Sequence, residues 1–228
     1  MFQKDYFMRM IEQFSLALAK IIGLKIAGKV EESQQTINDS LKHFTGVSEE
    51  TVEILTYKDL INIIGRGSLE KCSIIAELLK QKADIYVVKG DTSAAYNLYL
   101  KSFAIYVEVI MAGDSEYFEN NEHKANGIID ILRQFKIPNE TKQLLFQYYE
   151  HTKKYAKAED VLFEWLESMN YKDSELLDQG IAFYDRLSNR EPRELEEGNL
   201  PMDEVLEGQD KLRGLKKLLV VSVKTTQK

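Results

Sequence analysis

The sequence predicts an all-α protein, and three observations carry that prediction. Apolar residues recur at steps of three and four along most of the chain, as they do on one face of a helix. Leu, Ile, Ala, Lys and Glu are abundant, whereas 3 prolines and 12 glycines in 228 residues leave little material for the turns of an all-β fold. We expect antiparallel helical hairpins stacked side by side, and 44% hydrophobic residues suffice for a sizeable core.

The first predicted helix covers about residues 5–29. Its inner face is expected to carry Phe7, Met10, Ile11, Phe14, Leu18, Ile21 and Ile22. Packing of this face onto the next hairpin, binding to a membrane surface and pairing with a second subunit are three alternatives for it. Residues 31–44 form the predicted partner helix, with Ile37, Leu41 and Phe44 as its apolar steps.

Two short helices should follow, and Ser48 is the predicted N-cap of the first because its hydroxyl can accept from an unpaired amide. The second covers residues 58–64. The Gly65-Arg66-Gly67-Ser68 segment then invites a phosphate-site hypothesis. It lacks the lysine of a phosphate-binding loop and follows no strand, so we interpret it as punctuation before a helix. Residues 48–68 also offer no basic recognition helix for DNA.

The central stretch, residues 68–106, reads as two long helices that fold back on each other at Gly90-Asp91. The second of them is apolar on more than one face, so neighbours must cover it from two sides. It should continue to a stop at Gly113. Cys72 lies in the first helix, where a small buried hydrophobe is the expected role rather than a reactive thiol.

The next predicted helix begins with solvated residues 115–126 and buries Ile128, Ile129, Ile131, Leu132 and Phe135 before Pro138. A second hairpin covers about 139–169, with Trp165 expected in the core. A helix over 172–187 follows, with Ala182 as its point of close approach.

The segment 189–228 is acidic up to Asp210 and basic from Lys211 onward. Such a bipolar end favours closure on itself as the polar cap of a stack, and recruitment of a partner is the alternative. The predicted organisation is therefore one domain, with a helical-hairpin stack over 1–188 and a capping segment over 189–228.

The central hairpin resembles the tetratricopeptide repeat (TPR), a helical hairpin of roughly 34 residues. The resemblance rests on Leu79, Ala83, Tyr86, Gly90, Ala95 and Tyr99, on a second copy with Tyr149, Tyr155, Ala158, Leu162 and Trp165, and on a weaker third with Gly28, Ser33, Ile37 and Ser40. It implies an irregular, TPR-like right-handed superhelix. The whole chain, including its YFMRMIEQFSLALAK opening, also looks like an uncharacterised Firmicutes family of helical proteins, a likeness that implies a helical fold and a bacterial source but does not indicate any activity.

Several classes of function are disfavoured by composition. A net charge of −7 argues against a nucleic-acid platform. His43, His123, His151 and Cys72 lie far apart in sequence, so we expect no metal, and no catalytic or cofactor motif appears. The apolar run near the amino terminus is broken by Glu12 and Lys20 and is too short for a membrane span. A soluble, cytoplasmic, non-enzymatic protein is the expectation.

The TPR resemblance implies a groove lined by the first helix of each hairpin. The candidate wall residues are Glu77, Lys80 and Asp84 in one copy and Gln143, Gln147 and Glu150 in the other. Asp84 departs from the carboxylate-clamp pattern, so a neutral or basic protein partner, or a second copy, is expected. The predicted function is thus a protein-interaction module. The alternatives are a homo-oligomer built through the amino-terminal helix, and an enzyme or small-ligand binder with a pocket between hairpins.

Overall fold

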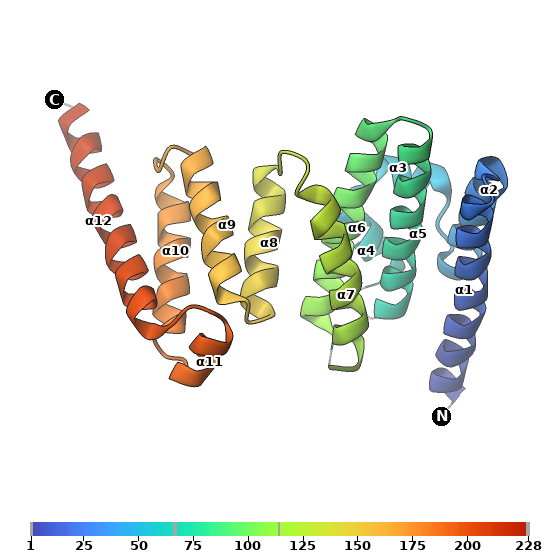
Figure 1. Cartoon of the computed structure of the whole chain (residues 1–228), viewed down its shortest axis with the longest axis horizontal. Helices are drawn as coiled ribbons and strands as arrows, with labels where there is room; N and C mark the ends of the chain where they lie inside the picture. Colours follow the sequence, from blue (N-terminus) through green and yellow to red (C-terminus); the bar gives the residue numbers. More distant parts are fainter. Residues whose placement is uncertain (1, 66–67, 114, 227–228) are drawn as a thin grey trace. The chain divides into compact units, whose positions relative to one another are not determined.

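The computed structural model describes the backbone of residues 2–65, 68–113 and 115–226, and the side chains of residues 8–65, 68–113 and 120–221. Within this described part, the chain forms twelve helices and no strand (Figure 1), which confirms the all-α prediction. The chain divides into two compact units, Met1–Ile137 and Pro138–Lys228. The predicted boundary at residue 188 lies within the second unit.

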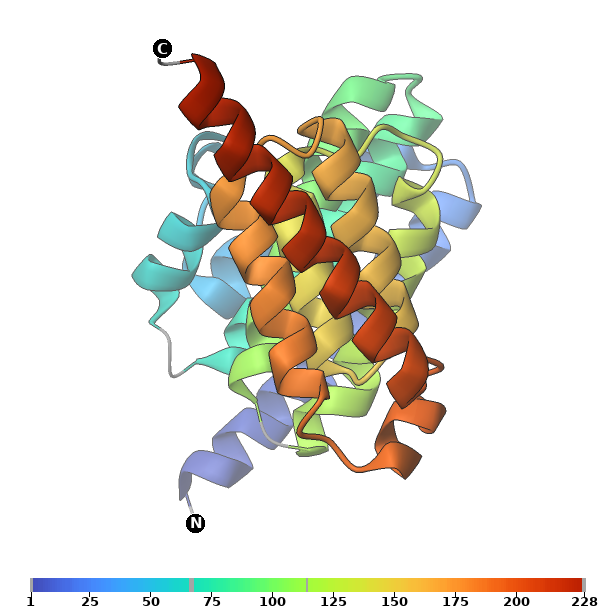
Figure 2. The same cartoon turned by 90° about the vertical axis from the view of Figure 1, so that its left-hand side faces the viewer.

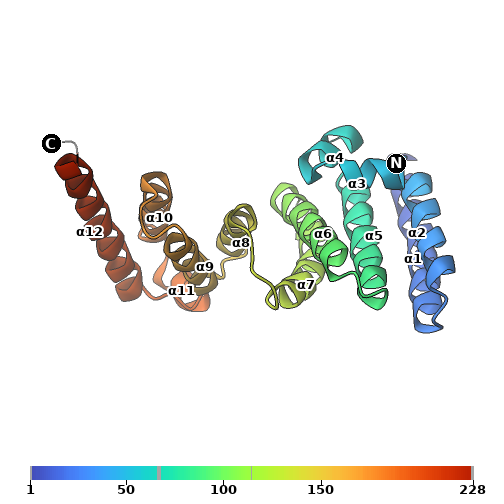
Figure 3. The ribbon, with the colours of Figure 1, turned by 90° about the horizontal axis from the view of Figure 1, so that it is seen from above.

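Unit 1 contains seven helices in its described residues: α1 (Phe2–Ile26), α2 (Val30–Thr45), α3 (Glu49–Ile54), α4 (Tyr57–Ile64), α5 (Leu69–Val88), α6 (Thr92–Ala112) and α7 (Ser115–Leu132). Seen from above, α1 and α2 lie on the far side of α5 from α6 (Figure 3). In packing order, α2 lies against α5, α5 against α6 and α6 against α7, while α4 rests on α5 and α6.

The central hairpin bends where the sequence predicts it. Gly90 has φ +80°, a conformation that glycine adopts without penalty. The backbone N–H of Asp91 donates to the carbonyl of Tyr86 at 2.9 Å, and the Asp91 side chain accepts from the N–H of Ala94 at 2.9 Å. One residue therefore closes α5 and starts α6.

Neighbouring helices cover α5 on both sides. Its buried residues include apolar ones, such as Leu79 and Ala83, and also Glu77, Gln81 and Lys82. Cys72 is buried, as expected. Burying a polar group is costly unless it is hydrogen-bonded, so the three polar residues require partners from other helices.

The first of the two short helices begins with the predicted cap, whereas no cap was predicted for the second. Ser48 Oγ accepts from the N–H of Thr51 at 3.3 Å, and Thr56 caps α4 through the N–H of Asp59 at 3.2 Å. Arg66 and Gly67, on which the phosphate-site hypothesis depended, lie outside the described residues.

Unit 2 contains α8 (Asn139–His151), α9 (Tyr155–Ser168), α10 (Ser174–Leu187), α11 (Pro192–Glu197) and α12 (Met202–Thr226). Figure 2 shows α12 crossing α10. The close approach depends on glycines, because a Cβ on Gly180 would meet Leu212 and one on Gly208 would meet the ring of Tyr184. The prediction of Ala182 as the close-approach residue was wrong by two positions.

Four other expectations need correction. Ile11 and Ile22, predicted on the inner face of α1, are exposed, while Phe7 lies outside the described side chains. Phe135 lies beyond the end of α7 and is 38% exposed, with its ring 5.1 Å from that of Tyr96. Trp165 is half-buried rather than in the core.

The carboxy-terminal segment pairs some of its own charges, because Arg190 lies 3.6 Å from Glu194 and Arg193 lies 3.0 Å from Glu197. Two basic residues of α12 reach acids of α10 instead: Arg213 lies 2.9 Å from Asp185, and Lys216 pairs with Asp178. The reason is geometric, since α12 is a single straight helix whose basic half lies along α10 and not beside its own acidic half.

Candidate functional site

The first group of predicted groove residues lies where α1 and α6 meet α5. Asp84 accepts from Lys25 Nζ at 2.5 Å, from Lys80 Nζ at 3.0 Å and from the hydroxyl of Tyr99 at 2.7 Å. Burial raises the pKa of the Asp84 carboxyl, but these hydrogen bonds and the charge of Lys80 outweigh burial, so its pKa lies below the ordinary value. Asp84 is therefore a carboxylate that ties α1 to the central hairpin.

Glu77 lies two turns earlier on α5 and is only 7% exposed. Its carboxylate accepts from the Tyr106 hydroxyl and from Gln81 Nε2, each at 2.9 Å, and lies 3.2 Å from Lys124 Nζ. Burial raises the pKa of Glu77, but the charge of Lys124 and the hydrogen bonds from Gln81 and Tyr106 lower it by more than burial raises it. The pKa of Glu77 therefore lies below its ordinary value. The buried group stays ionised because its partners compensate for lost water.

Gln81 joins the two carboxylates into one network. Its Oε1 accepts from Lys25 Nζ at 2.7 Å, while its Nε2 donates to Glu77. The connected path runs from Lys124 on α7 through Glu77 and Gln81 to Lys25 on α1. Glu77 and Asp84 thus serve contacts between helices of unit 1, and Lys80 keeps the most open surface of the three predicted residues.

The second group of predicted groove residues belongs to unit 2. Gln143 is exposed and Gln147 half-buried on α8. Both oxygens of Glu150 accept from the guanidinium of Arg186, at 2.7 Å each, which joins α8 to α10. Binding of a partner by either group stays a prediction.

A further buried cluster was missed from the sequence. Lys82 is 1% exposed, and its amine lies 2.6 Å from Glu49 and 2.8 Å from Glu53 on α3. Burial lowers the pKa of Lys82, but the hydrogen bonds to these carboxylates raise it above the ordinary value. Lys101 donates to the carbonyls of Val52 and Leu55 at the end of the same helix. The sequence places Lys82 among the apolar positions of α5, which could have indicated a buried charge. The spacing of residues along α5 does not show which carboxylates on another helix would pair with it.

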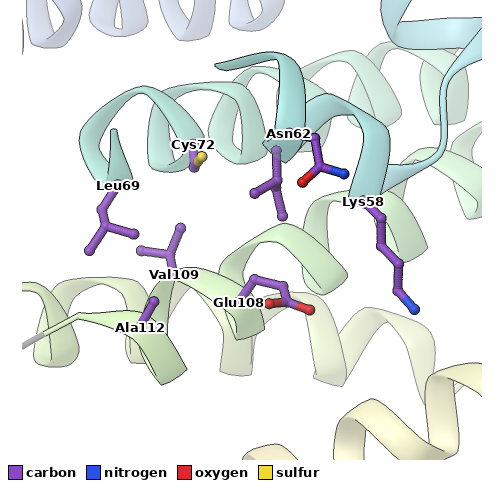
Figure 4. Close-up of a pocket in the computed structure, with 8 residues that line it drawn as sticks. Lys58, Asn62, Leu69, Cys72, Glu108, Val109 and Ala112 are labelled. Atoms are coloured by element: carbon purple, nitrogen blue, oxygen red, sulfur yellow. The ribbon is translucent and has the colours of Figure 1, made fainter. Parts of the chain in front are cut away.

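A cavity of about 430 Å³ lies between α4, α5 and α6 (Figure 4). Its lining combines polar Lys58, Asn62 and Glu108 with apolar residues and Cys72. Burial raises the pKa of the Cys72 thiol to about 11, so the thiol is protonated at neutral pH and a poor nucleophile. In Figure 4 the amine of Lys58 points away from Cys72, so the polar groups do not converge on one point.

The outer side of α1 is the most unusual surface of unit 1. Nine exposed residues form what we call the open face of α1: Met8, Ile11, Glu12, Ser15, Leu16, Ala19, Ile22, Gly23 and Ile26. Leu16 is 74% and Ile26 82% exposed. The opposite side of the same helix buries Met10, Phe14 and Ile21 against the unit. This helix is therefore apolar on two faces, and unit 1 covers one of them.

The described part of the chain contains neither a cluster of metal-binding side chains nor a membrane-spanning helix. Among those residues, no three His, Cys, Asp or Glu side chains gather to hold a metal ion. None of the described helices combines the length and apolar character that crossing a bilayer requires.

Comparison with known proteins identifies a family whose function is unknown. No curated protein and no solved structure matches the chain, so the TPR resemblance gains no support from these comparisons. The expectation of an uncharacterised family is confirmed. Residues 1–217 match the model of DUF6483, a family of unknown function, and the chain belongs to that family.

Proposed function

We propose that this chain is a non-enzymatic protein-interaction module that docks its partner on the open face of α1. The observation that carries the proposal is the exposure of Met8, Ile11, Leu16, Ile22 and Ile26 along one side of a helix whose other side is already packed. Contiguous exposed apolar surface of this kind marks interaction sites in soluble proteins. Glu12 is the charged residue within the face, so little desolvation opposes docking.

The groove first predicted on α5 is less well supported. Glu77 and Asp84 already hold α1, α6 and α7 in place, and their use by a partner would require those bonds to open. The cavity beside Cys72 supports a catalytic alternative still less, because its polar groups do not converge.

TPR-like stacking and a bacterial cytoplasmic location are part of the same proposal. Ala83, Ala95 and Ala158, the small positions on which the resemblance rests, are all buried, which supports close pairing of α5 with α6 and of α8 with α9. The right-handed superhelix is the arrangement that the repeat family implies.

Site-specific photo-crosslinking in cells tests the proposal. A photoreactive amino acid replaces Leu16 on the open face, and Leu218, similarly exposed on α12, provides the matched control position. We expect covalent products of higher mass from position 16 and few from position 218. Equal yields at both positions, or products at neither, would contradict a dedicated docking face.

A further inference from the structure

We propose that the partner on the open face of α1 is a second copy of this chain, with the two α1 helices antiparallel about a two-fold axis at Ala19. This inference rests on the proposed function, since it names the occupant of the same face. A two-fold interface uses one patch twice, so the patch must be complementary to itself.

The open face meets that requirement through its pattern of small and large residues. Ser15, Ala19 and Gly23 are spaced four apart, which puts a shallow track of small side chains along the face. Small residues on such a track let two helix backbones approach closely. A Cβ added at Gly23 would meet no atom of its own chain within 4 Å, so the track is open.

An axis at Ala19 sets residue i level with residue 38 − i of the second copy. Leu16 then lies beside Gly23 of the second copy, on the same lateral side of the contact, and Ile22 lies beside Ser15 of the second copy on the other side. These two large side chains each meet a small one, and Ile26 lies level with Glu12 of the second copy. This alternation is the arrangement that fills space between packed helices.

Charge does not oppose the pairing. The two Glu12 side chains would lie 14 residue steps apart, or about 21 Å along the helix axis. That separation exceeds the screening length of about 8 Å at physiological salt, so their repulsion is weak. Arg9 and Lys20 lie at one edge of the face, where their charged groups reach water.

The size of the face predicts a reversible dimer. In this register the second α1 is level with Leu16, Ile22 and Ile26, which together expose roughly 350 Å² of surface per copy, or about 700 Å² for a pair, a size that fits a weak, transient contact. A membrane surface is a less suitable occupant, because helices that lie on membranes carry many Lys and Arg beside the apolar face. Here Arg9 and Lys20 are the exposed basic residues of 8–26, on a chain of net charge −7.

Sedimentation velocity of the purified full chain, from about 1 to about 100 µM, tests the inference. We expect the mass to rise with concentration from 26.3 kDa towards twice that value. The double substitution Leu16→Glu with Ile26→Glu should weaken dimerisation at least about tenfold, because four new charges would be buried in the pair and those at position 26 would lie level with Glu12 of the second copy. Leu206→Glu with Leu218→Glu, at exposed positions of α12, is the matched control and should dimerise as the natural sequence does.

Circular dichroism checks that each variant remains as helical as the natural chain, which the exposure of all four positions predicts. A natural chain of 26.3 kDa throughout that range would overturn the inference, as would equal dimerisation by the two double variants. Binding of the monomer to anionic vesicles, lost in the Leu16 and Ile26 variant, would overturn it in favour of a membrane.

The failure of this inference is distinguishable from that of the proposed function. A monomer that still yields crosslinks in cells from position 16, but not from position 218, would overturn the second copy as occupant and keep the docking face. A monomer without such crosslinks would overturn both.

Discussion

Two helices of equal length, α1 and α12, differ in how many of their exposed residues are charged. Each contains 25 residues. Residues 8–26 of α1 and 203–221 of α12 both present 12 exposed positions. In α1 three of the 12 are charged: Arg9, Glu12 and Lys20. In α12 seven are charged: Asp203, Glu204, Glu207, Asp210, Lys211, Arg213 and Lys217.

The inner sides of the two helices both bury apolar residues, Val205 and Leu212 on α12 and Met10, Phe14 and Ile21 on α1. They differ in their polar contacts, because α12 meets α10 through half-exposed ion pairs, whereas Lys25 of α1 reaches the half-buried Asp84 and the buried Gln81. It follows that α1 carries more large apolar residues than it buries against unit 1.

The largest stability effect is expected where α12 approaches most closely. In Gly208→Ala, the new methyl group would overlap the ring of Tyr184, which is fully buried, and should lower the free energy of unfolding by about 1–3 kcal/mol. Denaturant titration measures it.

Glycines without neighbours provide the controls for that substitution. Gly214 on α12 and Gly23 on α1 have no atom within 4 Å of an added Cβ. Alanine at either position should raise stability by about 0.5–1 kcal/mol through helix propensity. At concentrations where the chain is monomeric, a destabilising Gly23→Ala would indicate that the outer side of α1 is covered within the monomer, and the contrast between the helices would fail.

The next effect concerns the anchor of α1. Asp84→Asn leaves Lys25 and Lys80 without their carboxylate and should cost about 1–2 kcal/mol at neutral pH. Because the pKa of Asp84 is lowered in the folded state, its contribution is complete above the ordinary value of about 3.9 and is lost as pH falls through the lowered value.

Urea titrations of both proteins at neutral pH and near pH 3 measure this dependence. The difference between the natural chain and Asp84→Asn should shrink towards the acid end. A difference that stays constant with pH would show that the ion pair does not hold α1.

The smallest effect is expected for the ion pairs of α12. Arg213 and Asp185 are both about half exposed, so Arg213→Gln should change stability by less than about 1 kcal/mol. Gln209 continues to donate to Asp185 at 2.6 Å. A loss larger than that of Asp84→Asn would reverse the assignment of α1 as the helix with the stronger polar anchor.

Local signals in the sequence were sufficient for the helices and their ends. Gly90 with Asp91 placed the central bend, because a positive φ and a side-chain cap are properties of neighbouring residues. Ser48 was found for the same reason. The TPR-like spacing did not reveal that Glu77 and Asp84 are internal, because their partners lie on other helices, up to 59 residues away for Lys25.

Periodicity gave part of the orientation of α1, because Met10, Phe14 and Ile21 were predicted on the inner face and are buried. A helix that is apolar on two sides fits several inner faces equally well, so Ile11 and Ile22 were also assigned inward, although both are exposed. The extent of the open face depends on which side α2 and α5 cover, and periodicity does not contain that information.

The most direct test of the paired α1 helices is disulfide formation by Ala19→Cys under mild oxidation. A cysteine on a two-fold axis lies opposite its own copy, so the account predicts a covalent dimer of twice 26.3 kDa that forms readily at micromolar concentration. Gly214→Cys, on the exposed side of α12, should form no covalent dimer under the same conditions. Equal crosslinking of the two variants, or none for Ala19→Cys, would contradict it.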